Sequence, residues 1–119
     1  MQLIAHRAGE RTIVEVIADT IVLRTEQDVL DLMATAQYQH RADALALHAH
    51  NLADEFLDLR SGLAGAVLQK ISNYRFRLAV VGDFTNVPSR ALRDFIGESN
   101  RSGQVVFAAS VDEAAALLS

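Results

Sequence analysis

Ser61 has the surroundings of either a helix cap or a phosphate acceptor. It follows Asp58-Leu59-Arg60 and precedes Gly62-Leu63-Ala64-Gly65, where an apolar, helix-like run begins. As a cap, its hydroxyl accepts a hydrogen bond from a backbone N–H two or three residues further on. As a phosphosite, it carries about −1.5 to −2 charges at a helix N-terminus. Gly62 and Gly65 keep that turn narrow enough for a phosphate or another surface to approach. Capping is the simpler interpretation.

Carboxylates recur in the segments that follow the apolar runs. Gathered at one edge of the protein, they would suit a hard cation such as Mg²⁺ or acid–base chemistry. The simpler interpretation is a solvated rim, with Glu113 used to cap a helix. The residues concerned are Asp54, Glu55, Asp58, Asp83, Asp112 and Glu113.

His48 and His50 are two residues apart, so on a strand they face the same way. Together with His6 or His40 they would supply imidazole ligands for zinc. No third ligand stands at an informative spacing, so we expect an ordinary polar pair, with no metal and no cofactor. We likewise interpret Arg75 and Arg77 as solvated side chains of an amphipathic strand, rather than as a site for an anionic ligand or partner.

Known catalytic and nucleotide-binding motifs are missing from the chain. It contains no G-x-G-x-x-G, no G-x-x-x-x-G-K-[ST] and no G-x-S-x-G segment. It also has no cysteine, which excludes disulfides, thiolate nucleophiles and cysteine-bound zinc. We therefore predict no catalytic residue.

Five short strands and four helices are predicted to position these groups. The strands run from Leu3 to Arg7, Thr12 to Ala18, Asp43 to Ala49, Phe76 to Val81 and Val105 to Ala108. The helices run from about Glu26 to Gln39, onward from Ser61, from Pro88 and Ser89 to Gly97, and from Val111 to Leu118. Thr25 with Asp28, and Ser110 with Glu113, have the spacing of capping boxes. Asn51 to Arg60 is expected to be a polar loop that packs down on the domain, and Glu98 to Gly103 a polar turn.

This order, β-β-α-β-α-β-α-β-α, predicts one α/β domain over residues 1–119 with a mixed, mostly parallel sheet and an N-terminal hairpin. Functional groups of such folds collect at the carboxyl ends of the parallel strands. Here those ends are the Asn51–Ser61 loop, the Asp83–Pro88 loop and the region of Ser110.

Composition narrows the classes of function. The chain has 119 residues, of which 50% are hydrophobic, and a net charge of −4. An acidic domain lacks the general attraction for phosphate backbones, so we expect no nucleic-acid partner and no anionic membrane surface. No apolar run reaches the roughly 18 residues that span a bilayer, and the N-terminus does not resemble a secretory signal. We expect a cytoplasmic protein.

Two resemblances extend these predictions. The run from Phe56 to Asn100, which contains SGLAGAVLQK, NY, LAVVGDF and LRDFIGESN, is similar to a family of short bacterial domains of unknown function. The strand followed by Ser61-Gly62-Leu63 opening a helix resembles the STAS domain (sulphate transporter and anti-sigma factor antagonist). That resemblance implies a β/α superhelix with its helices largely on one face of the sheet. It also implies phosphorylation of Ser61 by a partner kinase. The acidic residue that STAS domains carry two positions before the serine is Leu59 here, and Asp58 is the nearest substitute.

We therefore expect a non-enzymatic, cytosolic regulatory or protein-interaction module, with Ser61 as its switch. The predicted partner or ligand site comprises Asp58, Ser61, Gly62, Asp83 and Phe84. The alternative is a small-ligand binder or enzyme that uses the carboxylate-rich edge of the sheet. A third interpretation is a structural subunit that self-associates through apolar residues of the loop, namely Phe56, Leu57 and Leu59.

Overall fold

The computed structural model describes residues 1–118 and has the predicted alternation of strands and helices, with one additional short helix. The strands are β1 (Gln2–Ala8), β2 (Arg11–Ile17), β3 (Ala44–His48), β4 (Arg77–Val81) and β5 (Val105–Ala108). The helices are α1 (Glu26–His40), α2 (Asp54–Leu57), α3 (Leu63–Asn73), α4 (Arg90–Ser102) and α5 (Val111–Leu118). No helix among these residues is long and apolar enough to cross a membrane.

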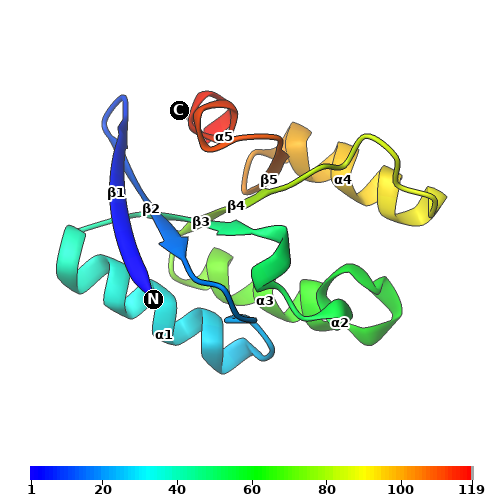
Figure 1. Cartoon of the computed structure of the whole chain (residues 1–119), viewed down its shortest axis with the longest axis horizontal. Helices are drawn as coiled ribbons and strands as arrows, with labels where there is room; N and C mark the ends of the chain where they lie inside the picture. The colour runs from blue at the N-terminus through cyan, green and yellow to red at the C-terminus, as the bar shows by residue number, and fades with distance from the viewer. Residues whose placement is uncertain (119) are drawn as a thin grey trace.

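The five strands form one mixed sheet in the order β1-β2-β3-β4-β5 (Figure 1). β1 and β2 are antiparallel, and every later pair is parallel. The predicted single α/β domain with an N-terminal hairpin is therefore confirmed. Each crossover connects a strand to its immediate neighbour, so the strand order never reverses. The sheet consequently has no switch-point crevice of the kind that holds ligands in doubly wound folds.

The sheet has a large core on one face and a smaller core on the other. Alternate residues such as Val14, Leu45 and Leu78 pack against α1 and α3 on the first face. α5 lies against the opposite face, where Ala114 and Leu118 are buried. The strand residues beneath α5 are small, which lets the helix approach the sheet closely. They include Ala44, Ala46, Ala79 and Ala108. The expected placement of the helices on one face therefore does not extend to α5.

The predicted helix caps are formed. The amide of Asp28 donates to Thr25 Oγ1 over 3.3 Å, and the Asp28 carboxylate accepts from the Thr25 amide over 3.2 Å. At α5 the amide of Glu113 donates to Ser110 Oγ over 3.1 Å, while the Glu113 carboxylate accepts from the Ala109 amide. Each of these contacts satisfies a backbone N–H that the first turn of a helix leaves without a partner.

The prediction that Gly97 ends the third predicted helix is wrong, and so is the polar turn predicted from Glu98 to Gly103. α4 continues through Gly97 to Ser102 and ends at Gly103, whose φ of +77° suits a glycine. A glycine inside a helix costs about 1 kcal/mol relative to alanine. Tertiary contacts beyond Gly97 offset that cost, because the Asn100 side chain makes two hydrogen bonds with the backbone of Phe107 in β5.

The segment predicted as a polar loop from Asn51 to Arg60 is largely helical. It contains α2 between two short 3₁₀ turns, at Ala49–Asn51 and Leu59–Ser61. Phe56 is fully buried in the main core, which confirms that this segment packs down on the domain. Burial of Phe56 also contradicts the interpretation that it belongs to an exposed self-association surface.

Candidate functional site

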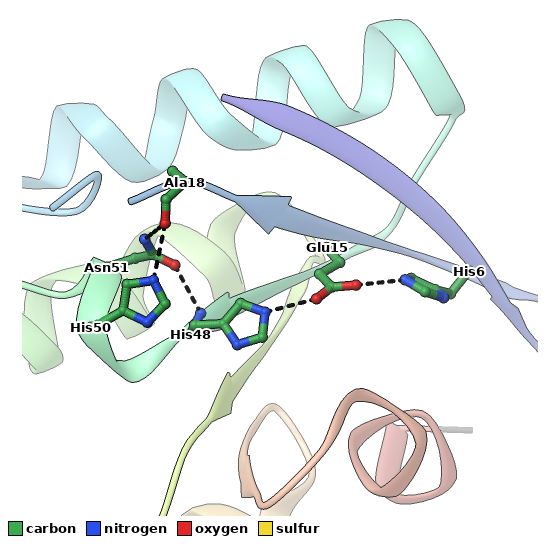
Figure 2. A network of polar contacts seen from close by, with 6 residues as sticks. All are labelled: His6, Glu15, Ala18, His48, His50 and Asn51. Carbon is green, nitrogen blue, oxygen red and sulfur yellow. Dashed lines mark hydrogen bonds and ion pairs between the residues drawn. The ribbon is translucent and has the colours of Figure 1, made fainter. Parts of the chain in front are cut away.

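A carboxylate held between two histidines lies on the face of the sheet that carries α5. Ala8, Ile13 and Ala46 belong to the core beneath α5. His6 of β1, Glu15 of β2 and His48 of β3 each lie two residues from one of them on the same strand, so their side chains project from the same face. His6 Nε2 lies 2.9 Å from Glu15 Oε1, and His48 Nε2 lies 2.7 Å from Glu15 Oε2. Figure 2 shows the three side chains in a row across the strands.

The environment of Glu15 favours its ionised form. Its side chain is only 13% exposed, and this burial by itself would raise the pKa of the carboxyl. Hydrogen bonds from His48 and His6, together with their charge interactions, outweigh burial, so the pKa of Glu15 is lowered. An ionised carboxylate only accepts hydrogen bonds, and therefore Nε2 of each histidine is the donor.

The turn after β3 is held by a buried asparagine. Asn51 is fully buried, and its amide nitrogen donates to the carbonyl oxygens of Ala18 and Thr20, each over 2.9 Å. Its side-chain oxygen accepts from the His48 amide. His50 Nε2 lies 3.0 Å from the carbonyl oxygen of Ala18 (Figure 2). These hydrogen bonds fix the end of β3 to the segment that follows β2.

α5 leaves one corner of this sheet face uncovered. Ile4 and Ile17, on β1 and β2, are 42% and 36% exposed there. Ile4 lies opposite Glu15 in the β1–β2 register, and Ile17 is the next residue of β2 on the same face as Glu15; the cluster formed by His6, Glu15 and His48 lies beside them. We call these five residues the hairpin face. The two isoleucines give this corner a small apolar area beside the polar cluster.

Ser61 lies at the start of α3, as predicted, although Gly62 occupies the capping position itself. Ser61 Oγ accepts a hydrogen bond from the amide of Leu63, two residues further on, over 3.2 Å. It also donates to the carbonyl oxygen of Glu55 over 2.5 Å. Asp58 accepts from the amide of Arg60 and ends α2. The predicted capping contact is therefore present, and Ser61 remains exposed.

Asp83 and Phe84 lie together in a different place from Asp58, Ser61 and Gly62. They line a groove of about 250 Å³ at the carboxyl ends of β4 and β5, which the other three residues do not line. Asp83 Oδ1 accepts from both the amide and the hydroxyl of Thr85. The hydrogen bond from the Thr85 hydroxyl lowers the pKa of Asp83 most, and the hydrogen bond from the Thr85 amide lowers it further. The ring of Phe84 packs edge-to-face against Phe107.

The carboxylates predicted to share one edge form no metal cluster. Residues 1–118 contain no group of three or more histidine, cysteine, aspartate or glutamate side chains that could hold a metal ion. His40 ends α1 on the opposite face of the sheet from His6 and His48. Arg75 lies in the turn before β4, and Arg77 donates to the carbonyl oxygen of Gly103.

Sequence reasoning missed Glu15 as a functional candidate. A signal was present: in a hairpin closed by Gly9 and Glu10, the alternation of the two strands puts His6 and Glu15 on one face. His48 joins them only through the parallel register of β3 against β2, in which Glu15 lies opposite Ala46. That register is a tertiary property.

The comparisons with known proteins identify a family without an assigned function. The family model described as "Domain of unknown function (DUF4180)" matches residues 8–118, from the last residue of β1 to the end of α5. No match to the chain was found among curated proteins or among solved structures. The predicted resemblance to a family of unknown function is thus confirmed, and the resemblance to STAS domains stays a prediction. The chain belongs to the DUF4180 family.

Proposed function

We propose that this domain is a non-enzymatic, cytoplasmic regulatory module that binds a protein partner through the hairpin face. The observation that carries the proposal is the incomplete cover of one sheet face. α5 buries the alanine-rich part, whereas Ile4 and Ile17 stay exposed beside a half-buried polar cluster. The lack of cysteine supports a reducing compartment.

The chemistry of the hairpin face defines the partner that suits it. Ile4 and Ile17 would receive apolar side chains, and burial of their remaining 42% and 36% exposed area contributes roughly 0.5 to 1.3 kcal/mol each. His6 Nε2 donates to Glu15, so in the neutral ring Nδ1 of His6 is an acceptor and favours a hydroxyl or N–H donor on the partner. β1 is an edge strand, and its outer backbone groups can add hydrogen bonds to an extended segment.

Affinity capture with matched variants tests this proposal. The baits are the wild-type chain, Ile17→Glu and Tyr38→Glu, with retained proteins read by mass spectrometry and then purified for a binding titration. Tyr38 is 91% exposed on α1, beyond the opposite face of the sheet, and serves as the control. We expect one partner that wild type and Tyr38→Glu bind and Ile17→Glu loses. Identical binding by all three baits, or turnover of a metabolite by the purified chain alone, would contradict the proposal. If sedimentation shows that the chain self-associates through the hairpin face, the partner would be a second copy of the chain.

Phosphorylation of Ser61 remains the proposed switch. Its support is the exposed hydroxyl at the start of α3, together with the sequential strand order, which agrees with the β/α superhelix of a STAS-like domain. A phosphate would remove the donor that Ser61 supplies to Glu55 and would add negative charge beside Asp58. Loss of the partner by Ser61→Glu but not by Ser61→Ala supports the switch. Equal binding by both variants argues for a cap alone.

A small ligand is the second candidate, and the groove beside Asp83 and Phe84 favours it. This groove offers aromatic contacts and an oriented carboxylate in about 250 Å³. Thermal-shift screening against metabolites and divalent ions tests it. A large stabilisation that Asp83→Asn abolishes would support ligand binding, whereas no stabilisation by any compound would leave the protein-interaction module as the better account.

A further inference from the structure

The two edge strands of the sheet differ in how their outer backbone groups are satisfied. β5 has four residues, and the carbonyl oxygen of Ala108 accepts from β4, so the backbone of Phe107 points outward. The Asn100 side chain covers it, since it donates to the Phe107 carbonyl and accepts from the Phe107 amide. β1 has seven residues, all paired with β2 in one continuous register, and it has no second neighbour. The edge of β5 is therefore closed, whereas the edge of β1 is open.

The register of the hairpin identifies which backbone groups of β1 point outward. The carbonyl oxygen of Thr12 accepts from the Asp43 amide over 3.1 Å, so the backbone of Thr12 faces β3. Arg7 lies opposite Thr12 in a non-hydrogen-bonded pair, and it therefore directs its own N–H and C=O away from β2. Alternation gives Leu3 and Ala5 the same direction. No hydrogen bond within residues 1–118 occupies these outward groups.

β1 also lacks the features that keep natural edge strands from pairing with another chain. Such strands carry lysine or proline, contain a bulge, or are very short. The sequence of β1, QLIAHRA, has neither residue type, and its register has no bulge. Its one permanent charge is turned onto its own hairpin, because the Arg7 guanidinium donates to Thr12 Oγ1 over 2.7 Å. The open edge is consequently a template for a further strand.

The outer edge of β1 is complementary to itself. If two β1 strands run antiparallel about a two-fold axis at Ala5, Leu3 of one copy lies opposite Arg7 of the other, and each outward N–H meets a C=O. Ile4, which is 42% exposed, then lies opposite His6 of the second copy in a pair whose side chains approach closely. The two Arg7 residues are about 14 Å apart along the strands, beyond the Debye length of about 8 Å.

We propose that two copies of this chain associate by antiparallel pairing of their β1 strands, with Ala5 facing Ala5 across the axis. The occupant is a second copy because one symmetric register satisfies every outward backbone group and covers Ile4 without bringing the two Arg7 charges together. The extended segment that pairs with β1 is then β1 of the other copy. Pairing joins the two sheets and brings the two hairpin faces side by side. The inference does not rest on the partner proposed for the hairpin face.

Amide hydrogen exchange of the wild-type chain, compared at low and high protein concentration alongside sedimentation, tests the pairing without any variant. The amides of Leu3, Ala5 and Arg7 should become protected as the dimer forms. Those of Ile4 and His6 face β2 and should be protected at both concentrations. A chain that stays monomeric, or a dimer in which the three outward amides exchange as fast as in the monomer, would overturn the proposal.

A pair of charge variants tests the register. The Ala5 side chain is exposed, so Ala5→Lys and Ala5→Glu displace no core residue. Each variant alone places like charges opposite one another, which should raise the dissociation constant of the dimer about fivefold or more. An equimolar mixture should restore the dimer, because lysine then faces glutamate. Tyr38→Lys and Tyr38→Glu are the controls and should dimerise like wild type. A mixture that dimerises no better than either Ala5 variant alone would overturn the register.

Ile17→Glu separates this inference from the function proposed above. Ile17 lies on β2, away from the open edge, so its replacement should remove the foreign partner and leave the dimer intact. Ala5→Lys should weaken the dimer even if no foreign partner exists. Loss of the dimer in Ile17→Glu but not in Ala5→Lys would overturn the edge pairing and place the second copy on the hairpin face instead.

Discussion

Replacement of Glu15 by glutamine tests the polar cluster on the hairpin face. The carboxylate accepts hydrogen bonds from His6 and His48 at 2.9 and 2.7 Å, and its side chain is 13% exposed. Hydrogen bonds to a charged group contribute about 1.5 to 3 kcal/mol each. The amide keeps one oxygen for one histidine but presents an NH₂ group to the other. We therefore expect Glu15→Gln to lower the free energy of unfolding by about 2 kcal/mol near neutral pH.

The loss should depend on pH in a defined direction. The ordinary pKa of a glutamate is 4.5, and the folded state lowers the pKa of Glu15. Ionised Glu15 therefore stabilises the fold above pH 4.5, and this contribution disappears as the pH falls through the lowered value. The difference between wild type and Glu15→Gln should shrink over the same range, because glutamine does not titrate.

Urea unfolding followed by circular dichroism, from about pH 7 down to about pH 3.5, measures this difference. Glu10→Gln is the matched control, because Glu10 is exposed in the hairpin turn and its replacement should change stability by less than about 0.5 kcal/mol. A Glu15→Gln penalty that is constant across the pH range would refute the reasoning, and so would a penalty no larger than that of Glu10→Gln.

Three further substitutions and one control substitution test the local structure by thermal and urea unfolding. Gly82→Ala should destabilise by about 1 to 3 kcal/mol, because the added Cβ would lie 2.8 Å from Cβ of Ala49. Gly65→Ala is its control in α3, where no atom lies within 4 Å, and it should stabilise by about 0.5 to 1 kcal/mol. Asn51→Ala should cost about 3 kcal/mol, since three part-buried hydrogen bonds to the backbone are lost, at about 1 kcal/mol each. Arg75→Gly should stabilise by about 0.5 to 1 kcal/mol, because Arg75 has a φ of +56°. A change of the opposite sign at any position would contradict the local structure described.

Sequence periodicity predicted most of the fold for a physical reason. β-Branched residues such as Ile13, Val14 and Val16 fill the hairpin, and Leu78 to Val81 form a buried parallel strand. These patterns are set by burial on one or both faces of a strand. The capping residues Thr25 and Ser110 act within one helical turn, so local spacing was sufficient to identify them.

The errors arose where contacts distant in sequence decide the local structure. The sequence predicts a helix stop at Gly97, yet Asn100 anchors the following turns to β5. It predicts a loop for the segment that contains Phe56, yet burial of that ring stabilises a four-residue helix. α5 could be predicted as a helix, but its position depends on small residues from three strands that lie side by side only in the folded sheet.

The candidate site was the least predictable part. Pairing of Glu15 with His48 requires the register between β2 and β3, which no spacing in the sequence reveals. His48 and His50 were noticed as a pair, but the acceptors that orient them, Glu15 and the Ala18 carbonyl, lie more than thirty residues away. The roles proposed for Ser61 and Asp83 stay predictions.

Site-specific photo-crosslinking in cells tests the hairpin face most directly as the binding surface. A photoreactive phenylalanine analogue replaces Ile17 in one variant and Tyr38, on the far side of the sheet, in the other. The account predicts a single defined protein adduct from position 17 and none from position 38. Adducts of the same pattern from both positions, or no adduct from position 17 in cells that express the folded chain, would contradict it.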